Sequence, residues 1–314
     1  MALSMVSETK IGLGLITCDR PEGCQKALGS LPWSRLLSVV LVNDGPAETL
    51  AKANIESAWP LQIIQNESRL GVGRSKNRAI KKLLASGVDH FFLMEDDIFI
   101  KNPSVFDRYL EAARSTGIQH LNFSQHGLKN KNAKGVSSPV AVVSYGNFQI
   151  ALHRHCVGAL SYYSRTCLEA VGLMDEEFYN GGEHLEHTYR IICAGFHPPF
   201  WFFADVYHSE DLLGDEPWSP VQSIIASRHR QSDLIDKSEI IFAARHGCTI
   251  GNIPVVQKRE VLQCLEKIRR KFGGGCSQAK QAVITWQSQP FCGGMGNTFL
   301  ARLFGTRKQA RPTY

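Results

Sequence analysis

The feature that most constrains this chain is an apolar run, residues 91–94, that ends in the three consecutive acids Glu95, Asp96 and Asp97. Four apolar residues in a row predict a buried strand of a parallel or mixed sheet. Three carboxylates at the tip of one strand repel one another, so stability alone does not explain them. In open α/β sheets, ligands bind beyond the carboxyl ends of the strands, where carboxylates suit a hard divalent cation that holds phosphates. These residues alone fit a metal site and a solvated acidic turn equally well.

The size and composition indicate a globular protein. A chain of 314 residues can form one large α/β domain or two lobes with an appendage, and 43% hydrophobic with 20% charged residues is typical of soluble proteins. No uninterrupted apolar stretch reaches the roughly 18 residues of a membrane span, and the first ten residues lack the pattern of a secretion signal. Nine cysteines without a CxxC pair are typical of reduced thiols. We therefore expect a cytoplasmic protein.

Positive charge is concentrated toward the C-terminus. From residue 257 onward, eleven Lys and Arg face two Glu, a net charge of +9, so the preceding residues carry −3 of the total of +6. This pattern predicts a near-neutral body with a basic extension, rather than a uniformly basic nucleic-acid-binding protein. Apolar and basic residues alternate over residues 299–308, which predicts either a short membrane-surface helix or an unstructured basic tail.

Strand and helix patterns alternate through the first third of the chain. The expected strands are 10–17, 36–42, 62–65 and the run before the acids, and the expected helices are 24–31, 47–58 and one that starts near Arg74. This alternation predicts a doubly wound α/β half.

The patterns that follow are more varied. We expect helices at 104–115, 162–172 and 255–271, strands at 119–123 and 200–203, a hairpin of 140–143 with 148–152, and a polar, mobile loop at 211–220.

Two helix starts carry polar residues suited to ligands. A loop with Gly71 leads into a helix that carries Arg74, Lys76 and Arg78, where phosphate oxygens could bind, although bases on an exposed helix face are usually only solvated. The second helix opens at Glu183.

In that second helix, Glu183 and Glu186 lie one turn apart, as do Glu183 and His187. The alternative is that Glu186 forms an ion pair with Arg190 and that the histidines are surface residues.

Several motifs occur together, in order, between about residues 10 and 210. They are Thr17-Cys18-Asp19-Arg20, Asn43-Asp44-Gly45, the segment from Gly71 to Asn77, Glu95-Asp96-Asp97, Gly158-Ala159-Leu160-Ser161 and Gly172-Leu173-Met174-Asp175. Together they resemble the inverting, nucleotide-sugar-dependent glycosyltransferases of the GT-A fold, close to family 2. The resemblance implies a Rossmann-like mixed central sheet flanked by helices, with a basic helical C-terminal extension.

The resemblance also implies roles for individual residues. Donor-binding residues would be Thr17, Asp19, Arg20, Asp44, Gly71, Arg74, Asn77, Glu95 and Asp96. Glu95, Asp96 and Asp97 occupy the DxD position. The resemblance implies that Asp97 holds Mn²⁺ or Mg²⁺ together with Glu95 and a late histidine, His208.

The sequence departs from the family where the catalytic base is expected. The family usually has Glu-Asp, with the aspartate as base, and this chain has Glu183-His184. We expect Glu183 to take the proton, because a carboxylate is more readily kept ionised than an imidazole, and His184 remains the alternative.

The expected function is transfer of a sugar, with inversion, from a nucleotide donor (a UDP-sugar by resemblance) to a hydroxyl of a glycan or lipid-linked acceptor. Residues 1–105 would bind the donor, 106–235 the acceptor, and 236–314 would form the extension, which could contact the inner membrane face. The alternatives are a non-catalytic nucleotide- or carbohydrate-binding module and a sugar nucleotidyltransferase. No nucleic-acid partner is expected.

Overall fold

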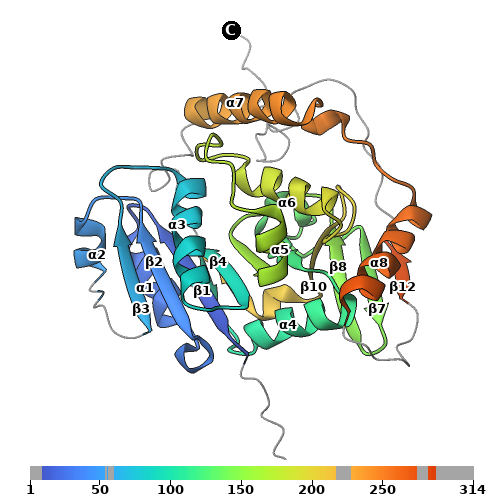
Figure 1. Cartoon of the computed structure of the whole chain (residues 1–314), viewed down its shortest axis with the longest axis horizontal. Helices are drawn as coiled ribbons and strands as arrows, with labels where there is room; N and C mark the ends of the chain where they lie inside the picture. The colour runs from blue at the N-terminus through green and yellow to red at the C-terminus, as the bar shows by residue number, and fades with distance from the viewer. Residues whose placement is uncertain (1–8, 54, 56–59, 217–227, 274–281, 288–314) are drawn as a thin grey trace, which may run out of the picture.

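The computed structural model describes residues 9–53, 55, 60–216, 228–273 and 282–287 (Figure 1). Its centre is a six-stranded sheet with the strand order β3-β2-β1-β4-β9-β6. The strands are β1 (Ile11–Thr17), β2 (Ser38–Asn43), β3 (Leu61–Gln65), β4 (His90–Glu95), β6 (His120–Asn122) and β9 (Leu160–Ser164). The first four run parallel, whereas β9 is antiparallel to β4 and to β6. The predicted mixed α/β sheet is confirmed.

Helices pack around the sheets of the molecule (Figure 1). They are α1 (Pro21–Gly29), α2 (Glu48–Lys52), α3 (Val72–Ala85), α4 (Val105–Thr116), α5 (Arg165–Val171), α6 (Glu183–Cys193), α7 (Arg228–His246) and α8 (Lys258–Phe272). Short 3₁₀ turns are η1 (Trp33–Arg35), η2 (Ser124–His126), η3 (Leu128–Asn130), η4 (Ser209–Asp211) and η5 (Ile250–Asn252).

The central strand β1 separates two apolar cores because its side chains alternate between the faces of the sheet. Leu13 and Leu15 pack in the core that contains α1. On the other face, β1 presents Gly12 and Gly14, and α3 packs directly on them. A Cβ atom on Gly14 would lie 2.7 Å from the Cβ of Ala79 in α3. The glycines thus bring α3, and the residues at its N-terminus, close to the sheet.

The second half of the chain adds a four-stranded antiparallel sheet with the order β10-β8-β7-β12. Its strands are β7 (Ala141–Tyr145), β8 (Phe148–His153), β10 (Phe203–Val206) and β12 (Val283–Trp286). The predicted hairpin is confirmed as β7 and β8. A separate two-stranded ribbon joins β5 (Ile98–Ile100), which follows the acidic turn, to β11 (Leu213–Asp215).

Three element predictions were wrong in part. The expected helix 162–172 begins only at Arg165, since the preceding residues pair in β9 and Ser164 caps α5 by accepting from the backbone N–H of Cys167 at 3.1 Å. In the expected strand 200–203 only Phe203 pairs, because the other aromatic residues are buried by packing. The expected loop 211–220 contains β11, and its part from 217 onward lies outside the described residues.

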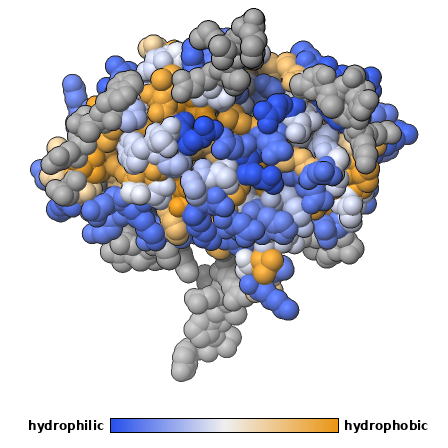
Figure 2. Space-filling view, turned by 90° about the horizontal axis from the view of Figure 1, so that it is seen from below, coloured by the Kyte–Doolittle hydropathy of each residue, from blue (hydrophilic) through white to orange (hydrophobic). Residues whose placement is uncertain are grey.

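The surface is mixed in character. Figure 2 shows a face on which hydrophilic residues predominate and apolar residues form smaller, separate areas. In the parts of the chain that the structure describes, no helix combines the length and the apolar character that a membrane crossing requires.

Candidate active site

The C-terminal ends of three parallel strands meet at one edge of the sheet. Thr17, the last residue of β1, is in register with Asn43 of β2, and Ile16 is in register with Glu95 of β4. The acidic turn that follows Glu95 therefore lies where open α/β sheets bind ligands.

Asp96, in the middle of the acidic turn, points into the protein. Its carboxylate accepts from the hydroxyl of Thr17 at 2.6 Å and from the guanidinium of Arg20 at 3.2 Å. Burial outweighs both partners and raises the pKa of Asp96 to about 7. Thr17, Arg20 and Asp96 therefore form one buried group behind the acidic turn, and the structure brings these three predicted donor-binding residues together.

Asp97, by contrast, keeps one oxygen without a partner. Its Oδ1 is buried and has no hydrogen-bond partner among the described residues, and its Oδ2 lies 3.3 Å from Nε2 of His126. Burial opposes ionisation, but His126 and Arg20 outweigh it and lower the pKa of Asp97. Nδ1 of His126 in turn lies 2.8 Å from Asp215, which also pairs with Lys131 at 2.8 Å.

His126 stands between these two carboxylates. Burial would lower its pKa, but Asp97 and Asp215 raise it to about 10. It lies on η2 directly after β6, and β11 supplies Asp215. The acidic turn is therefore linked to two later segments through one imidazole.

A buried lysine joins the acidic turn to α6. Nζ of Lys76, in the first turns of α3, lies 2.6 Å from Glu95 and 3.4 Å from Glu183, and it donates to the carbonyl oxygen of Gly158 at 3.2 Å. The Lys76 side chain is only 1% exposed. Burial alone would lower its pKa, but the two carboxylates outweigh burial and raise it. Lys76, a candidate phosphate-binding base from the sequence, is instead the counter-ion of two acids.

Glu183 and His184 begin α6 on the far side of Lys76. Oε1 of Glu183 lies 3.1 Å from Nδ1 of His184. Burial would raise the pKa of Glu183, but His184 and Lys76 lower it to about 2. Burial also raises the pKa of Glu95, despite the attraction of Lys76. The two predicted catalytic residues thus lie together and, through Lys76, next to the end of β4.

Two further predicted donor-binding residues shape the loop before α3. Asp44 accepts from the backbone N–H groups of Leu70 at 2.8 Å and Gly71 at 2.9 Å, and from the amide of Asn66 at 2.6 Å. Gly71 has φ +89°, and a Cβ there would lie 2.8 Å from the ring of Tyr179, so only glycine fits this turn.

The remaining predicted donor-binding residues contact other parts of the protein. Asp19, at φ 55°, pairs with Arg69. Arg74 is half-exposed and lies 3.4 Å from Glu176. Asn77 is buried and exchanges hydrogen bonds of 2.9 Å with the backbone of Met174. Arg69 and Asn77 thus hold loops, and Arg74 faces solvent.

Later along α6, the expected ion pair of Glu186 is confirmed, whereas the expectation that the histidines are surface residues is wrong for His187, which is fully buried. Glu186 forms an ion pair with Arg190 at 2.7 Å, and Nε2 of His187 donates to the carbonyl oxygen of Gly172 at 2.8 Å.

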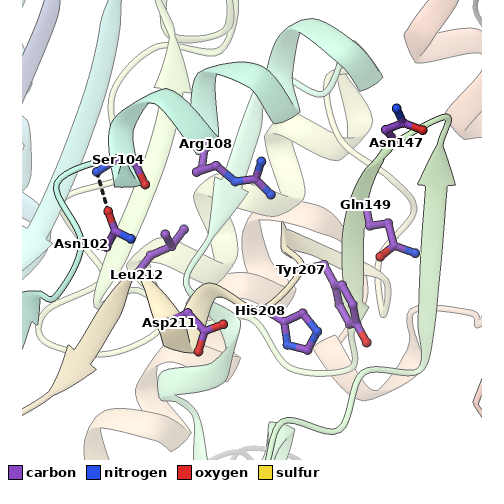
Figure 3. Close-up of a pocket in the computed structure, with 9 residues that line it drawn as sticks. All are labelled: Asn102, Ser104, Arg108, Asn147, Gln149, Tyr207, His208, Asp211 and Leu212. Atoms are coloured by element: carbon purple, nitrogen blue, oxygen red, sulfur yellow. Dashed lines mark hydrogen bonds between the residues drawn. The ribbon is translucent and has the colours of Figure 1, made fainter.

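The structure does not bring His208 to the acidic turn. The ribbon register places Asp215 beside Ile98, next to Asp97, whereas Leu213 lies beside Ile100 at the other end. His208 lies beyond that other end, in a cavity of about 370 Å³ (Figure 3). The cavity is lined by Asn102, Ser104, Arg108, Asn147, Gln149, Tyr207, His208, Asp211 and Leu212.

The predicted ligand set of Asp97, Glu95 and His208 is therefore not assembled, and Glu95 is bound to Lys76. Within the described residues, no three His, Cys, Asp or Glu side chains gather closely enough to hold a metal by themselves.

Sequence reasoning missed His126, Asp215 and the role of Lys76. Local patterns carry no signal for them, because each acts through partners more than 15 residues away along the chain. The glycine-to-asparagine motif did mark the helix that carries Lys76.

Comparisons with known proteins identify the fold. No protein-family model and no curated protein matches the sequence. Among solved structures, the mannosyltransferase PcManGT of Pyrobaculum calidifontis, in complex with GDP-Man and Mn²⁺, is 12% identical with a TM-score of 0.51, over 85% of this chain and 75% of that one. Residues 1–349 of S. aureus TarS are 14% identical with a TM-score of 0.47, over 84% and 72%. GalNAc-T7 with UDP, GalNAc and Mn²⁺ is 12% identical with a TM-score of 0.49, over 85% and 55%.

At this level of identity, the match to the mannosyltransferase concerns the fold alone. Together with the strand order and the acidic turn at the end of β4, it shows that the chain has the GT-A fold.

Proposed function

We propose that this protein is a metal-dependent glycosyltransferase that moves a sugar, with inversion, from a nucleotide donor to an acceptor hydroxyl. One observation carries the proposal. At the edge of a GT-A sheet, Asp97 keeps an unpartnered carboxylate oxygen, and Lys76 brings the Glu183–His184 pair to the same strand end. A hard cation-binding group and a proton acceptor are the two parts that a single displacement at an anomeric carbon needs.

The residues present fit a divalent cation. Asp97 offers a free oxygen, and Nε2 of His126 lies 3.3 Å from the other oxygen of the same carboxylate. Asp215 accepts from Nδ1 of His126, an arrangement that commonly fixes a metal-binding imidazole with Nε2 toward the ion. Two protein ligands suffice for Mg²⁺ or Mn²⁺ when phosphates and waters complete the coordination.

Asp97 would therefore hold the cation, and His126 would join it by giving up the Nε2 proton that Asp97 and Asp215 otherwise stabilise. The chemistry of the cation would be to compensate the charge of the departing diphosphate.

The donor is expected to be a nucleotide sugar. PcManGT, whose fold this chain shares, was solved with GDP-Man and Mn²⁺. A UDP-sugar is the expectation from the sequence motifs. Asp44 has its carboxylate occupied by backbone N–H groups, so it would shape the nucleotide site rather than bind the base with both oxygens.

The acceptor would be a hydroxyl of a glycan or a lipid-linked glycan. We also propose that the protein is cytoplasmic and contacts the inner membrane face through its basic end. Within the described residues that end includes α8, whose last turn carries Arg269, Arg270 and Lys271. The more distal basic residues lie outside the described part of the chain.

A second candidate is a binding module with the same fold and no turnover. The observation in its favour is that Glu183, the residue expected to act as base, is buried and paired with Lys76.

The test is release of nucleoside diphosphate from a panel of UDP- and GDP-sugars, with and without Mn²⁺. We expect slow metal-dependent hydrolysis of at least one donor, and its loss in the Asp97→Ala variant. Nucleotide binding without cleavage, even with glycan and lipid extracts as acceptors, would support the binding module. If no nucleotide binds, the proposed function is wrong.

A further inference from the structure

We propose that His184 is the general base of this site, and that Glu183 is a positioning residue that orients the imidazole. The inference rests on the proposed function and deepens it, because it assigns the proton transfer to a histidine. The starting observation is that two adjacent residues at the beginning of α6 have opposite environments.

Glu183 is poorly placed to receive a proton from a substrate. Its side chain is 3% exposed, and its Oε1 lies 3.4 Å from the ammonium of Lys76 and 3.1 Å from His184. A base must reach the hydroxyl from which it takes a proton, directly or through one water. A side chain with only 3% of its surface exposed leaves little room for an acceptor hydroxyl or a bridging water to approach.

His184 has the access that Glu183 lacks. Its side chain is 16% exposed, and within the described residues its Nε2 makes no hydrogen bond. Its ring rests on Gly158, where a Cβ would lie only 2.8 Å from the Cγ of His184. Gly158 precedes Ala159, whose carbonyl oxygen accepts from the backbone N–H of Glu95 at 2.8 Å. The imidazole therefore lies beside the end of β4.

The pairing with Glu183 also sets the tautomer. Lys76 holds Glu183 ionised, and an ionised carboxylate only accepts hydrogen bonds. Neutral His184 must then carry its proton on Nδ1 and donate it to Glu183, which leaves the Nε2 lone pair free. In many active sites a base activates the nucleophile, and a third group orients that base. In this site Lys76 pairs with Glu183, Glu183 accepts from His184, and His184 would take the proton of the acceptor hydroxyl.

The acceptor oxygen forms a bond to the anomeric carbon while its proton passes to Nε2 of His184. The bond between the anomeric carbon and the diphosphate oxygen breaks, and its electron pair leaves with the nucleoside diphosphate. His184 becomes a cation beside the anionic Glu183, which stabilises the product state.

The experiment measures nucleoside diphosphate release, with water as the acceptor, for the full-length protein with Mn²⁺ and the donor found active. His184→Ala should lower kcat by about 10²–10⁴-fold with donor KM nearly unchanged, and added imidazole should restore at least tenfold. Glu183→Gln should lower kcat on the order of 10²-fold without imidazole rescue. Glu177→Gln, which removes an exposed carboxylate paired with Arg245, is the matched control and should leave kcat unchanged.

Nucleotide binding separates the two claims. Both variants should bind nucleoside diphosphate with Mn²⁺ as the unsubstituted protein does, which also shows that they fold. If His184→Ala keeps its kcat within threefold while Glu183→Gln loses it, Glu183 is the base and this inference is wrong. If the unsubstituted protein cleaves no nucleotide sugar, the proposed function fails, and the inference with it.

Discussion

The acidic turn after β4 and the N-terminus of α6 have a common arrangement. Each places two polar residues next to each other in the chain. The first is buried and paired with other side chains (the locked residue), and its neighbour keeps a polar atom without a partner or is more exposed (the available residue). In the acidic turn, Asp96 is held by Thr17 and Arg20, and Asp97 keeps a free oxygen. In α6, Glu183 is locked and His184 is the more exposed.

The difference lies in what neutralises the locked residue. The partner of Asp96 is Arg20, which follows β1, so this ion pair lies entirely within the half of the chain proposed to bind the donor. Lys76 comes from α3 and serves Glu95 and Glu183 together, so it connects the acidic turn to α6. Within this site, Lys76 thus links the acidic turn, where we propose the cation, to the start of α6, where we propose the base.

The largest expected effect comes from removing the available acid. Asp97→Asn should reduce metal-dependent turnover by about 10³-fold, because a cation that compensates a leaving diphosphate is worth several kcal/mol. Steady-state release of nucleoside diphosphate with Mn²⁺ measures it. Asp96→Asn is the matched control, and equal losses in both variants would contradict the division between a locked and an available acid.

The next effect is on stability. Lys76→Met should lower the free energy of unfolding by about 3–5 kcal/mol, because it leaves Glu95 and Glu183 without their buried counter-ion. Urea titration followed by circular dichroism measures it. Arg74→Met, two residues earlier and half-exposed, should change stability by less than about 0.5 kcal/mol. A Lys76→Met variant as stable as the Arg74→Met variant would mean that Lys76 does not connect the two regions.

The cation site can be tested through its imidazole. His126→Ala should weaken Mn²⁺ binding about 10–100-fold, measured by electron paramagnetic resonance of free Mn²⁺ in the presence of nucleoside diphosphate. His208→Ala should leave Mn²⁺ binding unchanged, because His208 lies at the other end of the β5–β11 ribbon. The reverse result would restore the ligand set predicted from the sequence.

The last effect concerns Asp96 and pH. Its pKa of about 7 lies above the ordinary value of 3.8, so the folded protein holds this proton over a range in which the unfolded chain releases it. Stability from this group is therefore full below pH 4 and is lost as pH rises through 7, by at most about 1.4 kcal/mol per pH unit.

Unfolding of the protein and of its Asp96→Asn variant between pH 4 and 8 measures that loss. The stability difference between them should shift in favour of the variant as pH rises. Asp205, whose pKa burial also raises to about 7, contributes equally to both and cancels. A difference that stays constant with pH would show that Asp96 is ionised throughout.

The sequence predicted the parts of this molecule that depend on local pattern. Long apolar runs bounded by turn signals located β1, β2 and β4, and the acids at the end of β4 located the site. The three-residue strand β11 was missed, because its pairing with β5 is a long-range contact without a pattern of its own.

The same limit explains the errors within the site. From the sequence alone Lys76 resembles an exposed helix base, and only the fold brings Glu95 and Glu183 next to it. The sequence motif made His208 a candidate ligand, but the ribbon register separates it from Asp97, and we propose His126 in its place.

The most direct test of the account is calorimetric titration of the protein with UDP and with GDP, with and without Mn²⁺, repeated with Asp97→Asn and Asp96→Asn. We predict that one nucleotide binds only with Mn²⁺, that Asp97→Asn abolishes this binding, and that Asp96→Asn retains it. Binding that is equally tight without the metal, or that survives Asp97→Asn, would contradict the assignment of the acidic turn as the cation and diphosphate site.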